Sequence, residues 1–431
     1  MTPDTAPQKE EPVEPNRKDI DPQDEQAAVD PALFEEKPIA PPFERTVLTT
    51  PLHLVTSLES RTNRWTDWNG YTVPEVLTGL GDEYRALRGA AALMDVSPLV
   101  KYRIAGRDAF AFLQRLVTRD IENLGVHRAV HVILCESRGL VLGDGLLFRL
   151  ADDDYRLVTE ETHLAWLMDS SEGFRVRIED VSATLGTLSL QGPLSAFVLM
   201  QAGVGDVASL APFAARWVTI AGMPVYLSRT GASGDLRYEL WSDAEDAPHV
   251  WRWLVECGGP LGLRAAGFAL RELARLEAGL PRAGQDYLSA FAAIDAREAL
   301  PPAAIWASPA IDLDKGLFNG RAALRRGSDE PPARRVVSLA IEGLEPLRFS
   351  TLSLEGRVVG AATSTGFSPA LGANIALAVI DAEAAAAGAL LAAAERRDGL
   401  SVRETLASVR VLAKPARAHP RRLAVPAPLR P

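Results

Sequence analysis

The chain has 431 residues, a formal net charge of −10 and 24% charged residues, so it is long enough for two or three domains with sizeable cores. The negative charge argues against nucleic acid as a main partner, because phosphate binding requires concentrated Lys and Arg. No stretch approaches the roughly 18 consecutive apolar residues of a membrane span, and we therefore expect no membrane partner.

The first 45 residues form an acidic segment. Residues 1–45 contain twelve Asp or Glu, five Lys or Arg and nine prolines. Such a composition buries too little apolar surface to offset the entropy of ordering, so the sequence predicts a disordered tail. The segment is neither basic nor apolar, which is unlike a transit peptide or a secretion signal.

Cysteine and histidine usage predicts a cytoplasmic protein without a metal site. Cys135 and Cys257 are the only cysteines, which excludes a disulfide framework and a CxxC metal site and is typical of a reducing compartment. His127 and His131 are four residues apart but lie beside a strand-like run. That spacing does not form a metal-binding helix face, and a site of histidines alone requires three or four convergent ligands.

The first predicted elements after the tail surround an aromatic stretch. Residues 64–77 are aromatic and irregular, and apolar residues at helical spacing then predict a helix over 81–97 that ends near Asp95. A strand is predicted over 100–106.

A second helix is predicted over residues 106–120. Asp108 is its expected N-cap, and Phe110, Leu113 and Leu116 are expected on its inward face. Strand-rich segments separated by turn signals follow it, at 129–137, 140–160 and 174–192.

The remaining elements mix helices with strands. Helices are predicted at 193–205, 247–259 and 266–280. Because strands and helices do not alternate regularly, an α+β fold is favoured over a doubly wound sheet. A proline pair at 331–332 marks a domain boundary before a mostly β region. Near 395–413 the alanine content favours a helix, whereas the alternation at its end favours strands.

The stretch RTGASGDLRYELW, residues 229–241, is the most informative turn. Gly231 and Gly234 permit a tight backbone between two strand-like runs, which predicts a hairpin with a polar tip. Glu239 lies inside the return strand, where its carboxylate either faces solvent or holds a group in a pocket.

Common nucleotide and hydrolase motifs are missing from the sequence. No phosphate loop of the GxxxxGK type and no helix-opening GxGxxG occurs. The GFSP stretch at 366–369 is not a nucleophile elbow, because Ala370 occupies the position where that motif requires glycine.

Six segments in order resemble the folate-binding aminomethyltransferase family, typified by the T-protein of the glycine cleavage system. They are EYRALRGAAALMDVS (83–97), GRDAFAFLQRLVTRDIENL (106–124), RTGASGDLRYEL (229–240), ALRELARLEAGLP (269–281), KGLFNGRAAL (315–324) and STGFSPALGANIALA (364–378). The resemblance implies a three-unit folate-binding fold. Residues 46–330 would form two interleaved α+β units, and residues 331–431 would form a C-terminal β-barrel.

The resemblance also implies tetrahydrofolate as cofactor and a pterin pocket lined by the strand with Tyr238 and Glu239. A carboxylate can accept two hydrogen bonds from the pterin edge, and bonds to a charged acceptor are strong. Either Asp235 or Glu239 makes this contact, and we favour Glu239. Arg229 is expected to bind the cofactor as well.

Two arginines of the 269–281 segment are expected near the tail of the folate. The glutamate carboxylates of that tail suit the guanidinium forks of Arg271 and Arg275. The alternative is that both arginines form helix salt bridges with Glu272 or Glu277.

Asp120 falls where the family has its key aspartate, near N5 of tetrahydrofolate. A carboxylate there can orient the amine and stabilise positive charge. The alternative is a turn residue at a helix end.

Several positions depart from the T-protein pattern. Arg119 replaces an asparagine, His131 a tyrosine, Glu136 an asparagine and Ala232 a tyrosine. These changes surround the expected folate and substrate positions, so they favour a relative that demethylates a small molecule. We predict methyl transfer from a small O-methyl donor, with a methoxy-aromatic compound as one example, or from an S-methyl donor, to N5.

His131 and Arg119 are residue types that can protonate or stabilise the leaving atom. Trp65, Trp68 and Tyr71 are expected to pack a flat substrate, with Glu136 nearby, although aromatic side chains more often fill a core.

Two other functions stay open. One is aminomethyl transfer in a glycine-cleavage-type system, which would require a carrier protein as partner. The other is a non-enzymatic folate-binding protein of iron–sulfur maintenance, but that branch has a cysteine where this chain has Leu317.

Overall fold

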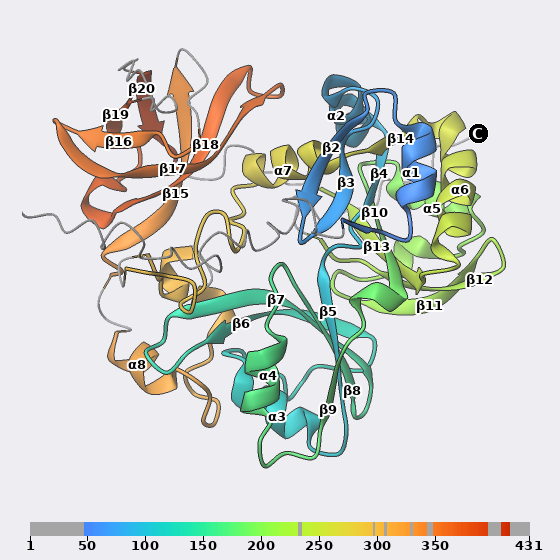
Figure 1. Ribbon diagram of the computed structural model, residues 1–431, viewed down its shortest axis with the longest axis horizontal. Helices are drawn as coiled ribbons and strands as arrows, with labels where there is room; N and C mark the ends of the chain where they lie inside the picture. Colours follow the sequence, from blue (N-terminus) through green and yellow to red (C-terminus); the bar gives the residue numbers. More distant parts are fainter. Residues whose placement is uncertain are drawn as a thin grey trace, which may run out of the picture. The chain divides into compact units, whose positions relative to one another are not determined.

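A computed structural model describes residues 47–231, 235–295, 298–305, 308–327, 331–342, 348–394 and 407–413. Its described part contains three open sheets and one closed barrel (Figure 1). The predicted acidic tail and Ala232 lie outside these residues, so nothing tests the expectations about them. Among the described residues, no helix has the length and apolar character needed to cross a lipid bilayer.

The first sheet is small and has the order β1–β3–β2. β1 (Leu48–Thr49) runs parallel to β3 (Tyr71–Val76), and β2 (Arg64–Trp68) runs antiparallel to it. Between β1 and β2, the helix α1 (His53–Glu59) packs against β3.

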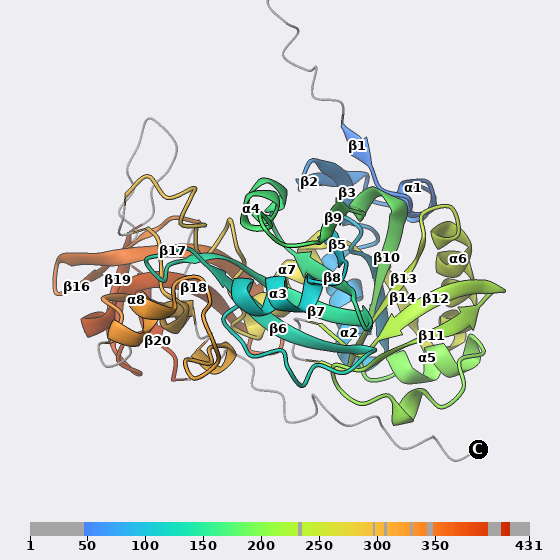
Figure 2. The same cartoon turned by 90° about the horizontal axis from the view of Figure 1, so that it is seen from below.

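A six-stranded sheet has the order β11–β12–β13–β10–β4–β14. Its strands are β4 (Ala91–Asp95), β10 (Leu185–Gln191), β11 (Ala215–Ile220), β12 (Met223–Ser228), β13 (Arg237–Asp243) and β14 (Leu263–Ala266). Its helices are α2 (Leu80–Gly89), α5 (Ser195–Gln201) and α6 (Ala247–Gly258). Figure 2 shows α6 alongside β10, β13 and β14, which it contacts.

A five-stranded antiparallel sheet has the order β6–β7–β8–β5–β9. Its strands are β5 (Val100–Ala105), β6 (Arg128–Cys135), β7 (Val141–Ala151), β8 (Asp154–Thr159) and β9 (Arg177–Asp180), and its helices are α3 (Ala109–Leu116) and α4 (Leu164–Ser170). The consecutive strands β4 and β5 belong to different sheets, so the chain leaves the six-stranded sheet and returns to it at β10.

The closed barrel has the order β15–β18–β17–β16–β19–β20. Its strands are β15 (Arg334–Glu342), β16 (Thr351–Leu354), β17 (Arg357–Ser368), β18 (Ala373–Asp381), β19 (Leu390–Ala394) and β20 (Ala407–Val411). The helix α7 (Phe268–Glu277) packs against β17, β18 and β3, and α8 (Arg321–Arg326) precedes the barrel. Short 3₁₀ turns occur at η3 (Ser182–Thr184), η4 (Val207–Ser209), η5 (Gly259–Leu261), η6 (Pro302–Ile305), η7 (Ser308–Ala310) and η8 (Ala382–Ala384).

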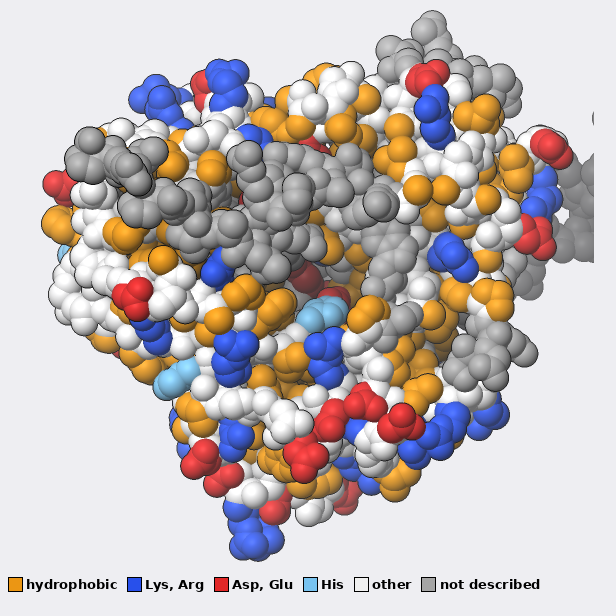
Figure 3. Space-filling view, turned by 180° about the vertical axis from the view of Figure 1, so that it is seen from behind, with side chains coloured by type: hydrophobic (Ala, Val, Ile, Leu, Met, Phe, Trp, Pro, Cys, Tyr) orange, Lys and Arg blue, Asp and Glu red, His pale blue; other side chains and the backbone are white. Residues whose placement is uncertain are grey.

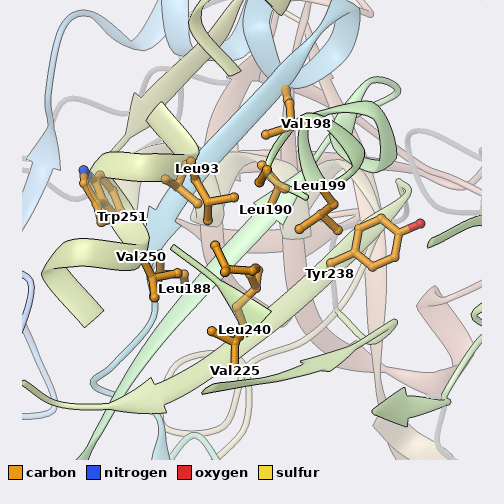
Figure 4. Close-up of a cluster of buried hydrophobic side chains, with 14 of the residues drawn as sticks. Leu93, Leu188, Leu190, Val198, Leu199, Val225, Tyr238, Leu240, Val250 and Trp251 are labelled. Atoms are coloured by element: carbon orange, nitrogen blue, oxygen red, sulfur yellow. The ribbon is translucent and has the colours of Figure 1, made fainter. Parts of the chain in front are cut away.

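Apolar residues at every second position of its strands bury one face of the six-stranded sheet in a hydrophobic core. Leu188 and Leu190 of β10, and Tyr238 and Leu240 of β13, are completely buried in one cluster with Trp251 of α6 (Figure 4). Residues two apart in a strand share a face, so the residues between these positions point to the other side of the sheet.

The predicted helix over 81–97 is wrong in its second half. α2 ends at Gly89, and Ala91–Asp95 form the strand β4. This strand is buried throughout and lies between β10 and β14. Pairing on both edges and burial on both faces outweigh the helix propensity of its alanines.

The second predicted helix has a different inward face from the expected one. Phe110 is exposed, whereas Phe112 is buried together with Leu113 and Leu116. The Asp108 side chain makes no capping bond to α3 and accepts instead from the backbone and side chain of Arg175.

The alternation near the end of the chain predicted a strand correctly where the structure describes it. Residues 407–411 form β20, which closes the barrel between β15 and β19. The alanine-rich residues 390–394 are also a strand, since barrel closure supplies pairing partners that local propensity does not include.

Candidate functional site

A cavity of about 650 Å³ lies among β6, β7, β8, β13, α7 and the segment that follows α7. This size is in the range of ligand-binding sites. Its ionisable lining groups include Arg119, His131, Asp144, Glu160, Arg229, Asp235, Arg237, Glu239, Arg271 and Tyr287. Around a recess near the centre of the face drawn in Figure 3, charged side chains of both signs lie among apolar ones and a histidine.

The predicted hairpin is confirmed, and it brings Glu239 to the cavity. β12 and β13 are antiparallel, with Ser228 opposite Glu239. The Glu239 side chain is nearly inaccessible, and its two oxygens accept from Nη2 of Arg237 at 2.8 Å and from the Thr230 hydroxyl at 3.1 Å. The Glu239 carboxylate at the cavity wall therefore already has two protein hydrogen-bond donors.

Tyr238 does not join the cavity. The alternation of β13 directs its ring into the apolar core, beside Leu190 and Leu199 in Figure 4. Its hydroxyl has no hydrogen-bond partner among the described residues, and burial raises its pKa to about 12. The ring position explains why Tyr238 and Glu239, although adjacent in sequence, cannot face one ligand from the same side of the strand.

Asp235 and Arg229 border the cavity from the turn of this hairpin. Asp235 forms an ion pair with Arg88 of α2, so its carboxylate is occupied by a protein cation. The Nη1 group of Arg229 donates to the carbonyl of Leu210 at 2.9 Å. Both predicted residues thus reach the cavity, each with a protein partner.

Arg271 borders the cavity, whereas Arg275 does not. The Arg271 guanidinium binds Glu160 and Glu272, and it lies 4.4 Å above the ring of Trp68. This cation–π contact places Trp68 beneath Arg271 and away from the cavity lining.

Arg275 lies in a buried ion cluster. Its guanidinium binds Glu272 and Asp286 at 2.7 Å each and the Ser364 hydroxyl at 2.8 Å. Burial raises the pKa of Glu272, but Arg275 and the neighbouring arginines outweigh burial and lower it to about 2. The cluster joins α7 to the barrel strand β17. The ion pair with Glu272 is the alternative that the sequence predicted for Arg275.

His131 belongs to a hydrogen-bonded group inside the cavity. Its Nε2 atom lies 2.6 Å from Oδ2 of Asp144, and the hydroxyl of Tyr287 donates to Oδ1 of the same carboxylate. Burial raises the pKa of Asp144, yet the bonds from His131 and Tyr287 outweigh this and lower it. Asp144 is therefore ionised near neutral pH and fixes the orientation of the imidazole.

Arg119 and Asp120 point in different directions. Arg119 borders the cavity and donates to the carbonyl of Pro309 at 2.6 Å, and within the described residues no carboxylate pairs with it. Asp120 is absent from the cavity lining, and its Oδ1 accepts from Gln114 at 2.6 Å and from the backbone of Glu122 at 2.9 Å. The Asp120 carboxylate thus completes a local turn.

Lys315, from the KGLFNG segment, holds this turn in place. Its Nζ group donates to the carbonyls of Val117 and Arg119 at 2.8 and 2.6 Å. Burial lowers the pKa of Lys315 to about 8 despite the nearby carboxylate of Asp120. The segment therefore positions the backbone on which Arg119 and Asp120 stand.

The structure does not bring the expected substrate residues to the cavity. Trp65 stacks near His53, with ring centroids 5.0 Å apart, and Tyr71 packs against the core around Trp68. Glu136 borders a separate surface pocket with Phe318, and its carboxylate closes a turn by accepting from two backbone groups.

The cavity residues without an expected ligand role include Asp144, Glu160, Thr230, Arg237 and Tyr287. Arg237 had a signal, because a residue two positions before Glu239 shares its strand face. Tyr287 lies 143 residues after its partner Asp144, a contact that no local pattern indicates. No group of three or more His, Cys, Asp or Glu in the described ranges could hold a metal ion.

Comparisons with known proteins agree with this architecture. The family model described as the GCVT N-terminal domain matches residues 54–298, and the one described as the glycine cleavage T-protein C-terminal barrel domain matches residues 334–411. The aminomethyltransferases of Bacillus pumilus and Geobacillus kaustophilus are 30% and 32% identical to the chain. These alignments cover 78% and 75% of the chain and 92% and 88% of the relatives.

A solved structure also shares the fold. The glycine cleavage system aminomethyltransferase T from Bartonella henselae superposes with a TM-score of 0.76, at 23% identity, over 86% of this chain and 99% of that one. This likeness confirms the predicted α+β fold with a C-terminal barrel.

Proposed function

Because the chain belongs to the glycine cleavage T-protein family of folate-dependent one-carbon transferases, we propose that it moves a methyl group from a small O-methyl or S-methyl substrate to N5 of tetrahydrofolate. The observation that carries this proposal is the His131–Asp144 pair inside the cavity. It provides a proton carrier beside the space where the leaving atom would be released.

Tetrahydrofolate would bind in the cavity through its pterin edge. When bound, it supplies a nucleophilic nitrogen at N5. Glu239 is buried at the cavity wall, and each of its oxygens retains a lone pair beyond its bonds to Arg237 and Thr230. The Nε of Arg237 and Oε2 of Glu160 are buried and have no partner among the described groups, so the cavity offers polar atoms that a polar ligand would satisfy. Glu239 would accept from the ring N–H and the exocyclic amine.

His131 would protonate the leaving atom. Its Nε2–H bond to Asp144 favours the tautomer in which Nδ1 is available on the far side of the ring. In the imidazolium form Nδ1 also carries a proton, and its delivery would convert a departing alkoxide or phenoxide into the neutral alcohol or phenol. A sulfonium donor releases a neutral thioether, which requires no proton. Asp144 and Tyr287 keep the ring in place and accompany its positive charge.

Arg119 favours a donor that carries an acidic group. Its guanidinium reaches the cavity, and the described chain supplies no carboxylate for it. Arg119 is half-buried, and this partial burial lowers its pKa. A substrate carboxylate would provide the missing bidentate partner. Methoxy-aromatic acids and sulfonium carboxylates have this group together with a transferable methyl.

The test uses the purified full chain with tetrahydrofolate and a panel of methoxy-aromatic acids and sulfonium carboxylates. The expected result is accumulation of 5-methyltetrahydrofolate with a member of the panel. His131→Gln should abolish the product from a methoxy-aromatic acid, because that leaving group requires a proton, but not the product from a sulfonium carboxylate. If tetrahydrofolate binds but no member of the panel yields the methylated product, the proposed donor class is wrong.

A second candidate is aminomethyl transfer, which the named relatives support. Here the donor would be an aminomethyl group on a carrier protein, ammonia and the free carrier would both leave, and 5,10-methylenetetrahydrofolate would form. The same pair of His131 and Asp144 could protonate the departing amine. Incubation with an aminomethylated carrier separates the two candidates, because their folate products differ by oxidation state.

A further inference from the structure

Arg237 and Glu239 form a nearly inaccessible ion pair on the cavity face of β13. Their exposed fractions are 8% and 3%, and Nη2 of Arg237 lies 2.8 Å from Oε1 of Glu239. The two residues are separated by two positions, so the strand places them on the same face. Both border the cavity.

The backbone of the 229–231 turn keeps the Arg237 side chain in this position. A Cβ atom at Gly231 would lie 2.0 Å from Cδ of Arg237, and the φ of Gly231 is +148°. Only glycine accepts both the close contact and this backbone angle. The stem of Arg237 therefore lies flat against the turn, and its guanidinium has little freedom to leave Glu239.

The pair leaves hydrogen-bonding capacity for a ligand. A guanidinium has five N–H donors, and the bond to Glu239 uses one of them. Nε of Arg237 is buried and has no hydrogen-bond partner within the described part of the chain. Burial lowers the pKa of Arg237, although Glu239 opposes this effect. A bound ligand with an acceptor beside Glu239 would accept from one of the Nη donors that this bond leaves unused.

The pair presents two acceptors followed by a donor. The edge of a 2-amino-4-oxopterin offers the complementary order: the exocyclic amine and the ring N–H as donors, then the oxygen at position 4 as acceptor. On the basis of the proposed folate site, we propose that Arg237 is a specificity residue that reads this oxygen while Glu239 reads the two donors. A 4-amino pterin would place a donor against the guanidinium and leave both groups unsatisfied.

Folic acid and aminopterin provide a pair of probes that differ at position 4, oxo or amino, and consequently at N3, which carries a proton only in folic acid. Their affinities for the full-length protein are measured by calorimetry at pH 7, where the pteridine rings of both compounds are uncharged, with 5-formyltetrahydrofolate as the reduced reference. We expect wild type to prefer folic acid by about 10- to 100-fold. Arg237→Met is expected to reduce this preference by about 10-fold or less, because the recognition of position 4 is lost, while the part that Glu239 contributes through N3 is retained.

Two further variants keep the test valid if Arg237→Met folds poorly. Arg237→Lys retains the charge but loses the planar fork, and Gly231→Ala displaces the stem while keeping the guanidinium. Both should reduce the preference, and Arg216→Met, an arginine of β11 outside the cavity lining, should not. Thermal unfolding of each variant without ligand checks that it is folded.

The outcomes separate this inference from the proposed function. If Arg237→Met weakens both ligands by the same factor, or wild type does not prefer the oxo form, the role of Arg237 is wrong while the folate site stands. If no folate binds, or Glu239→Gln leaves all three affinities unchanged, the placement of the pterin is wrong and this inference is overturned with it.

Discussion

Nε2 of His131 lies 2.6 Å from Oδ2 of Asp144, between the neighbouring strands β6 and β7. The register pairs Ile133 with Asp144 and His131 with Leu146, so the two side chains are diagonal neighbours on one face of the sheet. Diagonal positions are within reach of long side chains. A short hairpin thus creates an oriented imidazole that neither strand could hold alone.

Replacing His131 should impair the chemical step more than folate binding. We expect His131→Gln to lower kcat by about 10²- to 10⁴-fold, the usual contribution of a positioned acid or base, with little change in folate affinity. Asp144→Asn should have a smaller effect, about 10- to 100-fold, because it keeps the ring but alters its hydrogen bond.

The measurement for this pair is single-turnover kinetics over a range of pH, with calorimetry for folate. Tyr226→Phe is a suitable control, since its hydroxyl lies near His127 and outside the cavity lining. A wild-type kcat in His131→Gln, with an unchanged pH profile, would exclude the histidine as proton carrier.

Glu239 and Asp235 should contribute unequally to folate binding. Glu239→Gln is expected to weaken 5-formyltetrahydrofolate by about 10- to 100-fold, because a charged acceptor is lost from a buried site. Asp235→Asn should weaken it less, since Asp235 is paired with Arg88. Calorimetry on both variants measures the difference, and a larger loss in Asp235→Asn would reverse the assignment.

Arg275 should behave as a stabilising residue. Removing one partner of a buried ion pair costs about 3–5 kcal/mol, so Arg275→Met is expected to lower the free energy of unfolding by this amount, because it leaves Asp286 without its cation. Arg103→Met removes the more exposed pair with Asp154 and should cost less than about 1 kcal/mol.

Chemical denaturation of these two variants gives the free energies, and calorimetry gives the folate affinities. Since Arg275 is not part of the cavity lining, folate affinity should be retained at temperatures where the variant is folded. A selective loss of folate affinity with unchanged stability would instead support the predicted cofactor role.

His163 should make the fold sensitive to acid. The ring packs against Gly143, where an added Cβ would lie 2.5 Å from Nε2, and burial lowers the pKa of His163 from 6.5 to about 4 although the nearby Asp144 opposes this. Between pH 6.5 and 4 the unfolded chain binds a proton that the folded chain excludes. The free energy of unfolding therefore decreases by up to about 3 kcal/mol as the pH is lowered from 6.5 to 4.

The comparison for this prediction is the free energy of unfolding at pH 7 and pH 4.5 in wild type, His163→Gln and His249→Gln. The pH dependence should be smaller in His163→Gln than in wild type. His249 is exposed on α6, so its replacement should leave the dependence unchanged. Equal pH dependence in all three proteins would contradict the prediction.

Local sequence patterns correctly predicted the elements whose contacts lie between residues close together in the chain. The hairpin around Gly231 has a two-residue alternation and a turn-forming tip, and both of its strands formed as expected. Where partners come from distant segments, local patterns failed. Ala91–Asp95 became a strand because β10 and β14 pair with it. Phe112 is buried in place of Phe110 because it packs against the distant Phe174.

The residues predicted for the candidate site were likewise correct in part. Arg119, His131, Asp235, Glu239 and others were expected at a ligand site and border one cavity. Trp65 and Tyr71 do not border it, because aromatic residue type alone does not distinguish a core surface from a binding surface. The roles of these residues toward a ligand stay predictions until binding is measured.

The sequence by itself determined the family, the mixed fold with its terminal barrel, and the residue types available for one-carbon chemistry, since ordered segments and strand periodicity are properties of the chain. The tertiary structure alone decided which hydrogen-bond partners the charged side chains have. Asp144 finds Tyr287 and Arg275 finds Ser364 across separations of 143 and 89 residues. Such pairs form only when distant segments pack, because removing charged groups from water is favourable only where the fold supplies their partners.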